Sequence, residues 1–165
     1  MTEEIRKNRP GISEIAKYIV SVLIIIYVVL LLLFASGSSK PFEDVAAAVS
    51  GSLDTETLTR MDDRMLKRNF GLNSADYDGV MYYASTSSMS VEEVLLIRVD
   101  SRDQIQQISD AIDERIDARM DAFEGYAPDQ VRLLEDAQQS VRGRYIFFAV
   151  SSRATEYRNA FDTSL

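Results

Sequence analysis

The chain has 165 residues, of which 26 are acidic and 18 are basic, and its formal net charge is −8. Residues 1–35 hold four basic and three acidic residues, so the rest of the chain carries a net charge of −9. This charge repels nucleic acid, and we expect no nucleic-acid partner. The chain has no Cys and no His, which excludes disulfides, thiol nucleophiles and thiolate metal sites, and removes the side chain best suited to proton transfer near neutral pH.

A run without charge extends from Tyr18 to Ala35 and is interrupted mainly by Ser21. Its length approaches the roughly 20 apolar residues that cross a bilayer, so it predicts a transmembrane helix with the membrane as its partner. A cleaved signal peptide is the rival interpretation, because Ala35, Ser36 and Gly37 are small. The anchor is favoured, since a cleavable apolar region has only about 7 to 15 residues.

The basic residues beside this run predict its orientation. Four of them precede it, and within about 15 residues after it there is only Lys40. We therefore expect the N-terminus in the cytoplasm and the C-terminal domain outside the cell membrane. The expected parts are a cytoplasmic tail (1–17), a transmembrane anchor (18–35), a Ser/Gly tether (36–40) and an extracytoplasmic domain (41–165).

Two short helices are expected at the start of this domain. The first has apolar residues at helical spacing from Phe42 to Val49, and Gly51 is placed to end it. The second covers residues 57–69, and Gly71 closes it. Residues 73–79 then form a turn-rich connection.

Two hairpins, each followed by a helix, make up the rest of the domain. Val80–Ala84 and Val94–Val99 form the first hairpin. A long helix follows, with Ser101 as its N-cap and Gln104 in the capping-box position, and it ends before Gly125. After a helical turn that starts at Pro128, the second hairpin (137–142 and 144–151) turns at Gly143, and residues 155–161 form a terminal helix.

The predicted fold class is therefore α+β. An N-terminal transmembrane helix precedes a small ectodomain with a four-stranded antiparallel sheet in the order ββαββα, which two short helices precede. Three of the strands are apolar on both faces, so both faces of the sheet need a cover. Either the helices of residues 42–69 or a partner supplies the second cover, and internal cover is favoured.

Five residues are grouped as a possible interaction surface. Arg142 and Arg144 flank a turn and suit an anionic ligand, although pairing with the many acidic residues explains them more simply. Tyr126, after the long helix, marks either a ligand-contacting corner or a packing contact. Tyr82 and Tyr145 lie on doubly apolar strands. We expect no catalytic residues, no cofactor and no metal site.

The second half of the chain resembles a known bacterial family. Phe123, Tyr126 and Pro128 follow a long charged helix, and Leu133 or Leu134 and then Val141–Tyr145 lead into an apolar strand. This pattern resembles Domain of Unknown Function 4358 over about residues 41–163. The resemblance implies a small envelope protein with a lipoprotein signal or membrane anchor and one compact domain, and it implies no activity.

Together these observations predict a membrane-tethered extracytoplasmic interaction domain of the bacterial cell envelope, which is not an enzyme and whose specific role is unknown. Its partner would be an envelope protein or a wall-associated ligand, and its oligomeric state is left open. The alternative is a carboxylate-dependent hydrolase that acts on an envelope polymer. That alternative requires a cleft with two carboxylates, one of them with a raised pKa.

Overall fold

The computed structural model describes residues 12–35 and 40–165, and the chain divides into two compact units, residues 1–36 and 37–165. The first unit contains helix α1 (Ile12–Ala35). No helix in the described part of the chain is both long enough and apolar enough to cross a membrane. Residues 1–11 of the expected tail and residues 36–39 of the expected tether lie outside the described residues.

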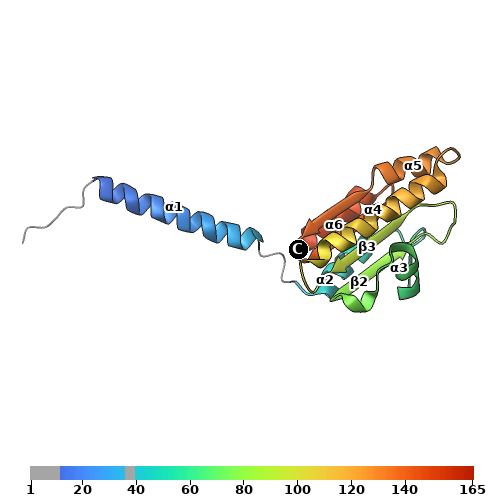
Figure 1. Ribbon diagram of the computed structural model, residues 1–165, viewed down its shortest axis with the longest axis horizontal. Helices are drawn as coiled ribbons and strands as arrows, with labels where there is room; N and C mark the ends of the chain where they lie inside the picture. Colours follow the sequence, from blue (N-terminus) through green and yellow to red (C-terminus); the bar gives the residue numbers. More distant parts are fainter. Residues whose placement is uncertain (1–11, 36–39) are drawn as a thin grey trace, which may run out of the picture. The chain divides into compact units, whose positions relative to one another are not determined.

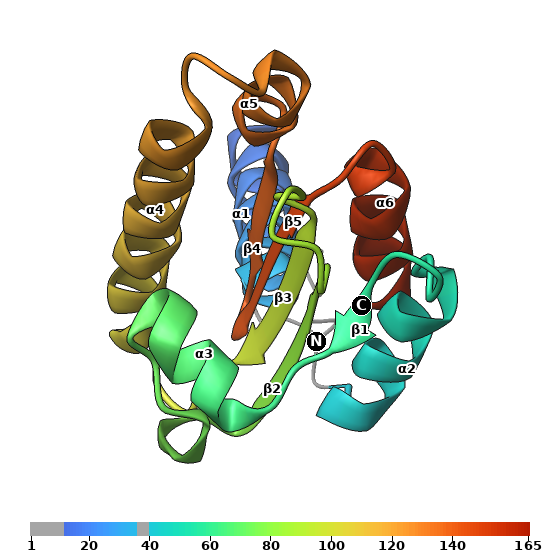
Figure 2. The ribbon, with the colours of Figure 1, turned by 90° about the vertical axis from the view of Figure 1, so that its right-hand side faces the viewer.

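The second unit is an α+β domain (Figure 1) built on a five-stranded antiparallel sheet, in the strand order β1-β2-β3-β5-β4 (Figure 2). The strands are β1 (Thr59–Arg60), β2 (Gly79–Ala84), β3 (Glu93–Arg98), β4 (Gln138–Arg142) and β5 (Tyr145–Val150). The helices of this unit are α2 (Phe42–Ser52), α3 (Asp63–Phe70), the 3-10 helix η1 (Ser74–Asp76), α4 (Gln104–Phe123), α5 (Pro128–Glu135) and α6 (Ala154–Ser164). The predicted α+β class and antiparallel sheet are confirmed, and the predicted strand number was one too low.

The missed strand is β1, which lies inside the region predicted as a helix from residue 57. Thr59 and Arg60 pair with Ala84 and Tyr83 of β2. The helix α3 begins only at Asp63, because the Asp62 side chain caps it by accepting a hydrogen bond from the backbone N–H of Met65 at 3.0 Å. At its other end Gly71 has a φ of 69°, which confirms the predicted C-cap.

Two other helix ends differ from the predictions. Gly51 does not end α2, which continues to Ser52 and is followed by the buried Leu53 in an extended conformation. The helix α4 starts after Asp103 and not after Ser101. Half of the predicted capping box is nevertheless present, because the Gln104 side-chain oxygen accepts a hydrogen bond from the backbone N–H of Ser101 at 3.2 Å.

Both faces of the sheet are covered from within the domain, which confirms the favoured interpretation. Side chains of α3, α4 and α5 form one apolar core with Tyr82, Leu95 and Phe148. The helices α2 and α6 lie on the opposite face (Figure 2), where their side chains form a second core with Leu96, Tyr145 and Phe147. The prediction was wrong in one respect. Of the helices in residues 42–69, only α2 lies on this second face, and the C-terminal helix α6 completes the cover.

The predicted order of hairpin, helix, hairpin and helix is present, with α5 inserted before the second hairpin. The central strands β3 and β5 pair along six residues, from Glu93 opposite Val150 to Arg98 opposite Tyr145. The helices α4 and α6 lie on opposite faces of the sheet. The two segments β2–β3–α4 and β4–β5–α6 are therefore not related by a two-fold axis normal to the sheet, because such an axis would place both helices on the same face.

Candidate functional site

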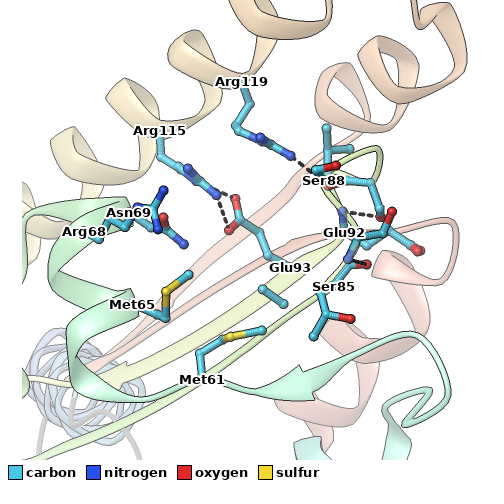
Figure 3. Close-up of a pocket in the computed structure, with 15 residues that line it drawn as sticks. Met61, Met65, Arg68, Asn69, Ser85, Ser88, Glu92, Glu93, Arg115 and Arg119 are labelled. Atoms are coloured by element: carbon cyan, nitrogen blue, oxygen red, sulfur yellow. Dashed lines mark hydrogen bonds and ion pairs between the residues drawn. The ribbon is translucent and has the colours of Figure 1, made fainter.

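An open cleft of about 520 Å³ lies where β3 begins, between α3, α4 and the loop that connects β2 to β3 (Figure 3). The helix α3 contributes Met65, Arg68 and Asn69 to its walls, and α4 contributes Arg115 and Arg119. The loop contributes a series of hydroxyl groups and Glu92. The cleft therefore combines cationic and hydroxyl groups with a small apolar floor.

A buried ion pair forms one wall of the cleft. Glu93 is only 2% exposed, and its carboxylate is bound by Arg115 in a bidentate manner, with Nε–Oε1 at 3.0 Å and Nη2–Oε2 at 3.1 Å. The Tyr82 hydroxyl also donates to Oε2 at 2.8 Å, and the Asn69 amide donates to that hydroxyl at 2.7 Å. Strand alternation directs Glu93 to the α4 face, so a charged residue stands where the strand would otherwise bury an apolar one.

The electrostatic effects of this network are clear in direction. Burial raises the pKa of Tyr82, and the nearby negative charge of Glu93 raises it further. Burial alone would lower the pKa of Arg115, but the hydrogen bonds and charge of Glu93 outweigh burial and raise it. The pKa of Arg119 is lowered, first by burial and then by the positive charge of Arg115. Among the neighbouring charges, Arg115 therefore affects the pKa of Arg119 more than Glu93 does.

Arg119 retains a donor that no described residue accepts. Its Nη2 donates to the backbone oxygen of Ser90 at 2.7 Å, and its guanidinium lies 4.6 Å from the centre of the Phe123 ring. Its Nε is buried and has no hydrogen-bond partner in the described part of the chain. Arg68 is exposed at the edge of the cleft, and no described acidic side chain forms an ion pair with it.

The loop between β2 and β3 is organised by its own hydroxyl groups. The hydroxyl oxygens of Ser85, Ser87 and Ser90 each accept a hydrogen bond from the backbone N–H two residues later. Because these oxygens act as acceptors, their hydroxyl protons remain available as donors. The cleft consequently presents guanidinium and hydroxyl donors together, which is the set of groups that binds carboxylate or phosphate oxygens.

The two carboxylates beside the cleft do not form an acid–base pair. Both oxygens of Glu93 accept hydrogen bonds from Arg115, and one of them also accepts from Tyr82. Glu92 accepts a hydrogen bond from the Ser151 hydroxyl at 2.9 Å. Among the described residues no group of three or more Asp, Glu, His or Cys side chains could hold a metal ion.

The five residues grouped from the sequence do not lie on one surface. Tyr82 and Tyr145 are both buried, at 3% and 0% exposure, and they lie in the cores on opposite faces of the sheet. The Tyr145 hydroxyl donates to the backbone oxygen of Lys40 at 2.8 Å. Tyr126 is 59% exposed and stacks on Phe123 with ring centres 5.5 Å apart, as the packing interpretation predicted.

The two arginines of that group have acidic neighbours. Arg142 lies 3.4 Å from Asp162, and Arg144 lies within 4 Å of Asp78 and Asp100. This is the pairing that the simpler interpretation of the turn predicted. Of the five residues only Tyr82 belongs to the network beside the cleft.

Sequence reasoning missed the arginines of the cleft. Arg115 and Arg119 are four residues apart on α4, so they lie on one face of the helix, beside its apolar stripe. Glu93 on the inward side of an apolar strand was the available signal, because a buried carboxylate requires a cationic partner.

Residues 51–151 match the family described as a domain of unknown function, DUF4358. The chain belongs to this family. The cleft residues that the structure brings together fall within the matched part of DUF4358, whereas most of α2 and all of α6 lie outside it. The match is narrower than the 41–163 expected from the resemblance. No curated protein and no solved structure matches the chain.

Proposed function

We propose that this DUF4358 protein is a membrane-tethered, extracytoplasmic binding domain of the cell envelope, and that its cleft receives a carboxylate or phosphate group of an envelope ligand. The observation that supports the ligand class is the pair of guanidinium groups, from Arg68 and Arg119, that line the cleft without an ion-pair partner among the described residues. Guanidinium groups bind carboxylate or phosphate oxygens through charge-assisted hydrogen bonds, and an anionic ligand would supply the missing partner of these two arginines.

The charge of the cleft supports the same ligand class. Three guanidinium groups line it, from Arg68, Arg115 and Arg119, against the two carboxylates of Glu92 and Glu93, so one positive charge is in excess. An excess of positive charge is unusual on a chain whose net charge is −8. Hydrogen bonds from these guanidinium groups to an anionic ligand would be charge-assisted and therefore stronger than hydrogen bonds between neutral groups.

The size and floor of the cleft suit a ligand larger than a single ion. Its volume of about 520 Å³ is within the range of small-molecule sites. Met61, Met65 and Val91 form apolar parts of the lining, and methionine side chains adapt readily to different shapes. The proposed ligand therefore carries an apolar portion next to its anionic group.

Binding accounts for this geometry better than hydrolysis does. A carboxylate-dependent hydrolase needs one carboxyl group that can donate a proton to the substrate and a second that acts as base or nucleophile. Glu93 has both oxygens occupied and is 2% exposed, so it supplies neither function in this arrangement.

The membrane tether is part of the proposal and rests mainly on the sequence. The charge-free run extends from Tyr18 to Ala35, whereas the structure describes side chains of α1 only from Lys17 to Val29. Within that part, the large apolar side chains are at least 46% exposed, and the Ser21 hydroxyl donates to the backbone oxygen of Lys17 at 2.9 Å. A helix that is apolar on all sides requires an apolar environment.

Fractionation tests the tether. We expect the full-length chain to remain in membranes after alkaline extraction, and external protease to digest the C-terminal domain in cells whose wall has been removed. Release of the chain by alkaline extraction would refute the tether. Protection of the C-terminal domain in intact spheroplasts, with digestion only after lysis, would refute the proposed orientation.

Titration with small anions tests the cleft. Inorganic phosphate and succinate are added to the full-length chain in detergent, and the Arg Nε–Hε resonances are followed by NMR. We expect saturable shifts of the Arg119 resonance and at least tenfold weaker binding in Arg119→Gln and Arg68→Gln, because a hydrogen bond to a charged group contributes about 1.5–3 kcal/mol.

The matched control is Arg64→Gln, since Arg64 lies on the same helix as Arg68, is 94% exposed and does not line the cleft. Equal weakening by Arg64→Gln would indicate nonspecific attraction. The absence of saturable shifts with both probes would refute an anion site.

A further inference from the structure

A chain of hydrogen bonds with a fixed direction leads from the buried ion pair to the wall of the cleft. In its ion pair with Arg115 the carboxylate of Glu93 is ionised, and an ionised carboxylate can only accept hydrogen bonds. The Tyr82 hydroxyl lies 2.8 Å from Oε2 of Glu93, so it must donate its proton to that oxygen. The charge at the buried end of the chain therefore sets the direction of its first hydrogen bond.

The same direction fixes the orientation of the Asn69 side-chain amide. The Tyr82 hydroxyl has a single proton, which is directed to Glu93, so its oxygen can only accept a hydrogen bond from Asn69. The amide nitrogen Nδ2 is accordingly the atom of Asn69 that lies 2.7 Å from this oxygen. A flipped amide would place two acceptor oxygens against each other. The carbonyl oxygen Oδ1 of Asn69 is therefore directed away from the Tyr82 hydroxyl.

This carbonyl oxygen is accessible to a ligand. Asn69 lies beside Arg68 on the α3 side of the cleft and is one of the residues that line it (Figure 3). Its Oδ1 accepts no hydrogen bond from the described part of the chain, and it is not enclosed by protein as the Nε of Arg119 is. The cleft consequently contains an acceptor whose position is set from within the core.

The surroundings of this acceptor restrict which donor can reach it. The guanidinium groups of Arg68 and Arg119 line the same cleft and suit an anion. They would repel an ammonium group that approached Asn69. A hydroxyl group carries no charge, and it can donate to Asn69 while its own oxygen accepts from a guanidinium group. A hydroxyl group on an anionic ligand therefore matches the donors and the acceptor of the cleft together.

We propose that Asn69 selects an anion that carries a hydroxyl group near its charge, such as a hydroxy acid or a polyol phosphate. Glu93 and Tyr82 are positioning residues in this proposal, because Tyr82 is 3% exposed and acts on the ligand only through Asn69. The inference rests on the proposed anion-binding function of the cleft and narrows its ligand class. It also gives the buried carboxylate a second role besides holding Arg115.

Two pairs of small anions test the preference for a hydroxyl group. Malate differs from succinate, and glycerol 1-phosphate from propyl phosphate, by hydroxyl groups, and above neutral pH the members of each pair carry the same charge. The probes are titrated into the full-length chain in detergent, and the Arg Nε–Hε resonances report binding. In at least one pair we expect the hydroxylated anion to bind about threefold to tenfold more tightly, as for one neutral hydrogen bond. The pair with the larger ratio identifies the anionic group as carboxylate or phosphate.

The possible failures of this experiment are distinguishable. Saturable binding with equal affinities within both pairs would overturn the role of Asn69 and leave the anion site intact. The absence of saturable shifts with all of the probes would overturn both the hydroxyl preference and the anion site on which it rests.

Substitutions in the natural chain test the positioning of Asn69. Asn69→Ala removes the acceptor, and Tyr82→Phe removes the hydroxyl that orients the amide, so in both variants the members of each pair should bind alike. Tyr77→Phe is the matched control, since Tyr77 is buried in the same core and does not line the cleft, and it should keep the preference. A preference that persists in Asn69→Ala or Tyr82→Phe, or that Tyr77→Phe also removes, would overturn the proposal.

Discussion

The two faces of the sheet are covered by different chemistry. On the face of α2 and α6 the buried side chains are mainly apolar or aromatic, and Phe147 stacks on Phe161 with ring centres 5.1 Å apart. On the face of α3 and α4 the core includes a buried Glu93 that is paired with Arg115. A buried ion pair of this kind adds little or nothing to stability compared with well-packed apolar residues.

This difference indicates that the two faces have different roles. The α2 and α6 face stabilises the sheet, and the α3 and α4 face gives up apolar packing at one end to hold Arg115 and Arg119 beside a cleft. The lower stability of a buried ion pair, compared with apolar packing, is explained if the arginines bind a ligand. The following predictions test this division, from the largest expected effect to the smallest.

The largest effect is expected on the apolar face. Phe161→Ala removes a ring that is fully buried against Phe147 and Tyr145, and it should lower the free energy of unfolding by about 3–5 kcal/mol. Chemical denaturation of the full-length chain in detergent measures the change. Binding of phosphate to the remaining folded chain should be unchanged, and a selective loss of that binding would contradict the division between the faces.

The second prediction removes one partner of the buried ion pair. Glu93→Gln leaves Arg115 without its carboxylate and should cost about 2–4 kcal/mol, somewhat less than a fully buried pair because Arg115 is 17% exposed. Denaturation of Glu93→Gln, Arg115→Gln and the double variant gives the coupling between them. Glu92→Gln is the matched control. Additive effects of the two single substitutions would show that the pair is not the unit that we describe.

The third prediction concerns Tyr82 and alkaline pH. Tyr82→Phe removes the hydrogen bond to Glu93 and should cost about 1.5–3 kcal/mol near neutral pH. Burial raises the folded-state pKa of Tyr82 above its unfolded value of about 10, so the folded state favours the protonated hydroxyl. The resulting stabilisation is complete below pH 10 and is lost as the pH rises through the folded-state pKa.

Denaturation between pH 8 and pH 11 measures this dependence. Above about pH 10 the natural chain should lose up to about 1.4 kcal/mol per pH unit more than Tyr82→Phe does, for the one proton involved. Parallel curves for the two proteins would contradict the placement of Tyr82 in the buried network.

The smallest effect is expected at the hairpin turn. Arg142→Gln removes an ion pair with Asp162 whose two side chains are 55% and 31% exposed, and it should cost less than about 1 kcal/mol. The change should shrink further in high salt. A cost above 2 kcal/mol, or a loss of phosphate binding, would contradict the description of Arg142 as part of an exposed ion pair with no role in binding.

Local patterns were sufficient to predict much of this fold. The apolar residues of α4 repeat at helical spacing, and Gly71 and Gly143 have the positive φ values that a helix end and a tight turn require. The strand β1 could not be predicted in the same way. It has two residues, too few for a periodic pattern, and it forms because the chain can pair with Ala84 and Tyr83 of β2.

The cleft depends on contacts between distant parts of the chain. Glu93 and Arg115 are separated by 22 residues, and the hydrogen bond from Arg119 to Ser90 spans 29. The sequence alone allows many different Arg–Glu ion pairs and does not distinguish between them. The register of β3, which directs Glu93 inward toward α4, selects this pair, and that register is a property of the folded sheet.

Photocrosslinking in intact cells tests the central claim most directly. A photoreactive amino acid is placed at Ser88, in the loop beside the cleft, and as a control at Asp113, on an exposed part of α4 away from it. The account predicts one discrete crosslinked species from position 88, its loss in the Arg119→Gln background, and none from position 113. The same species from both positions, or a species from position 88 that Arg119→Gln leaves unchanged, would contradict the cleft as the binding site.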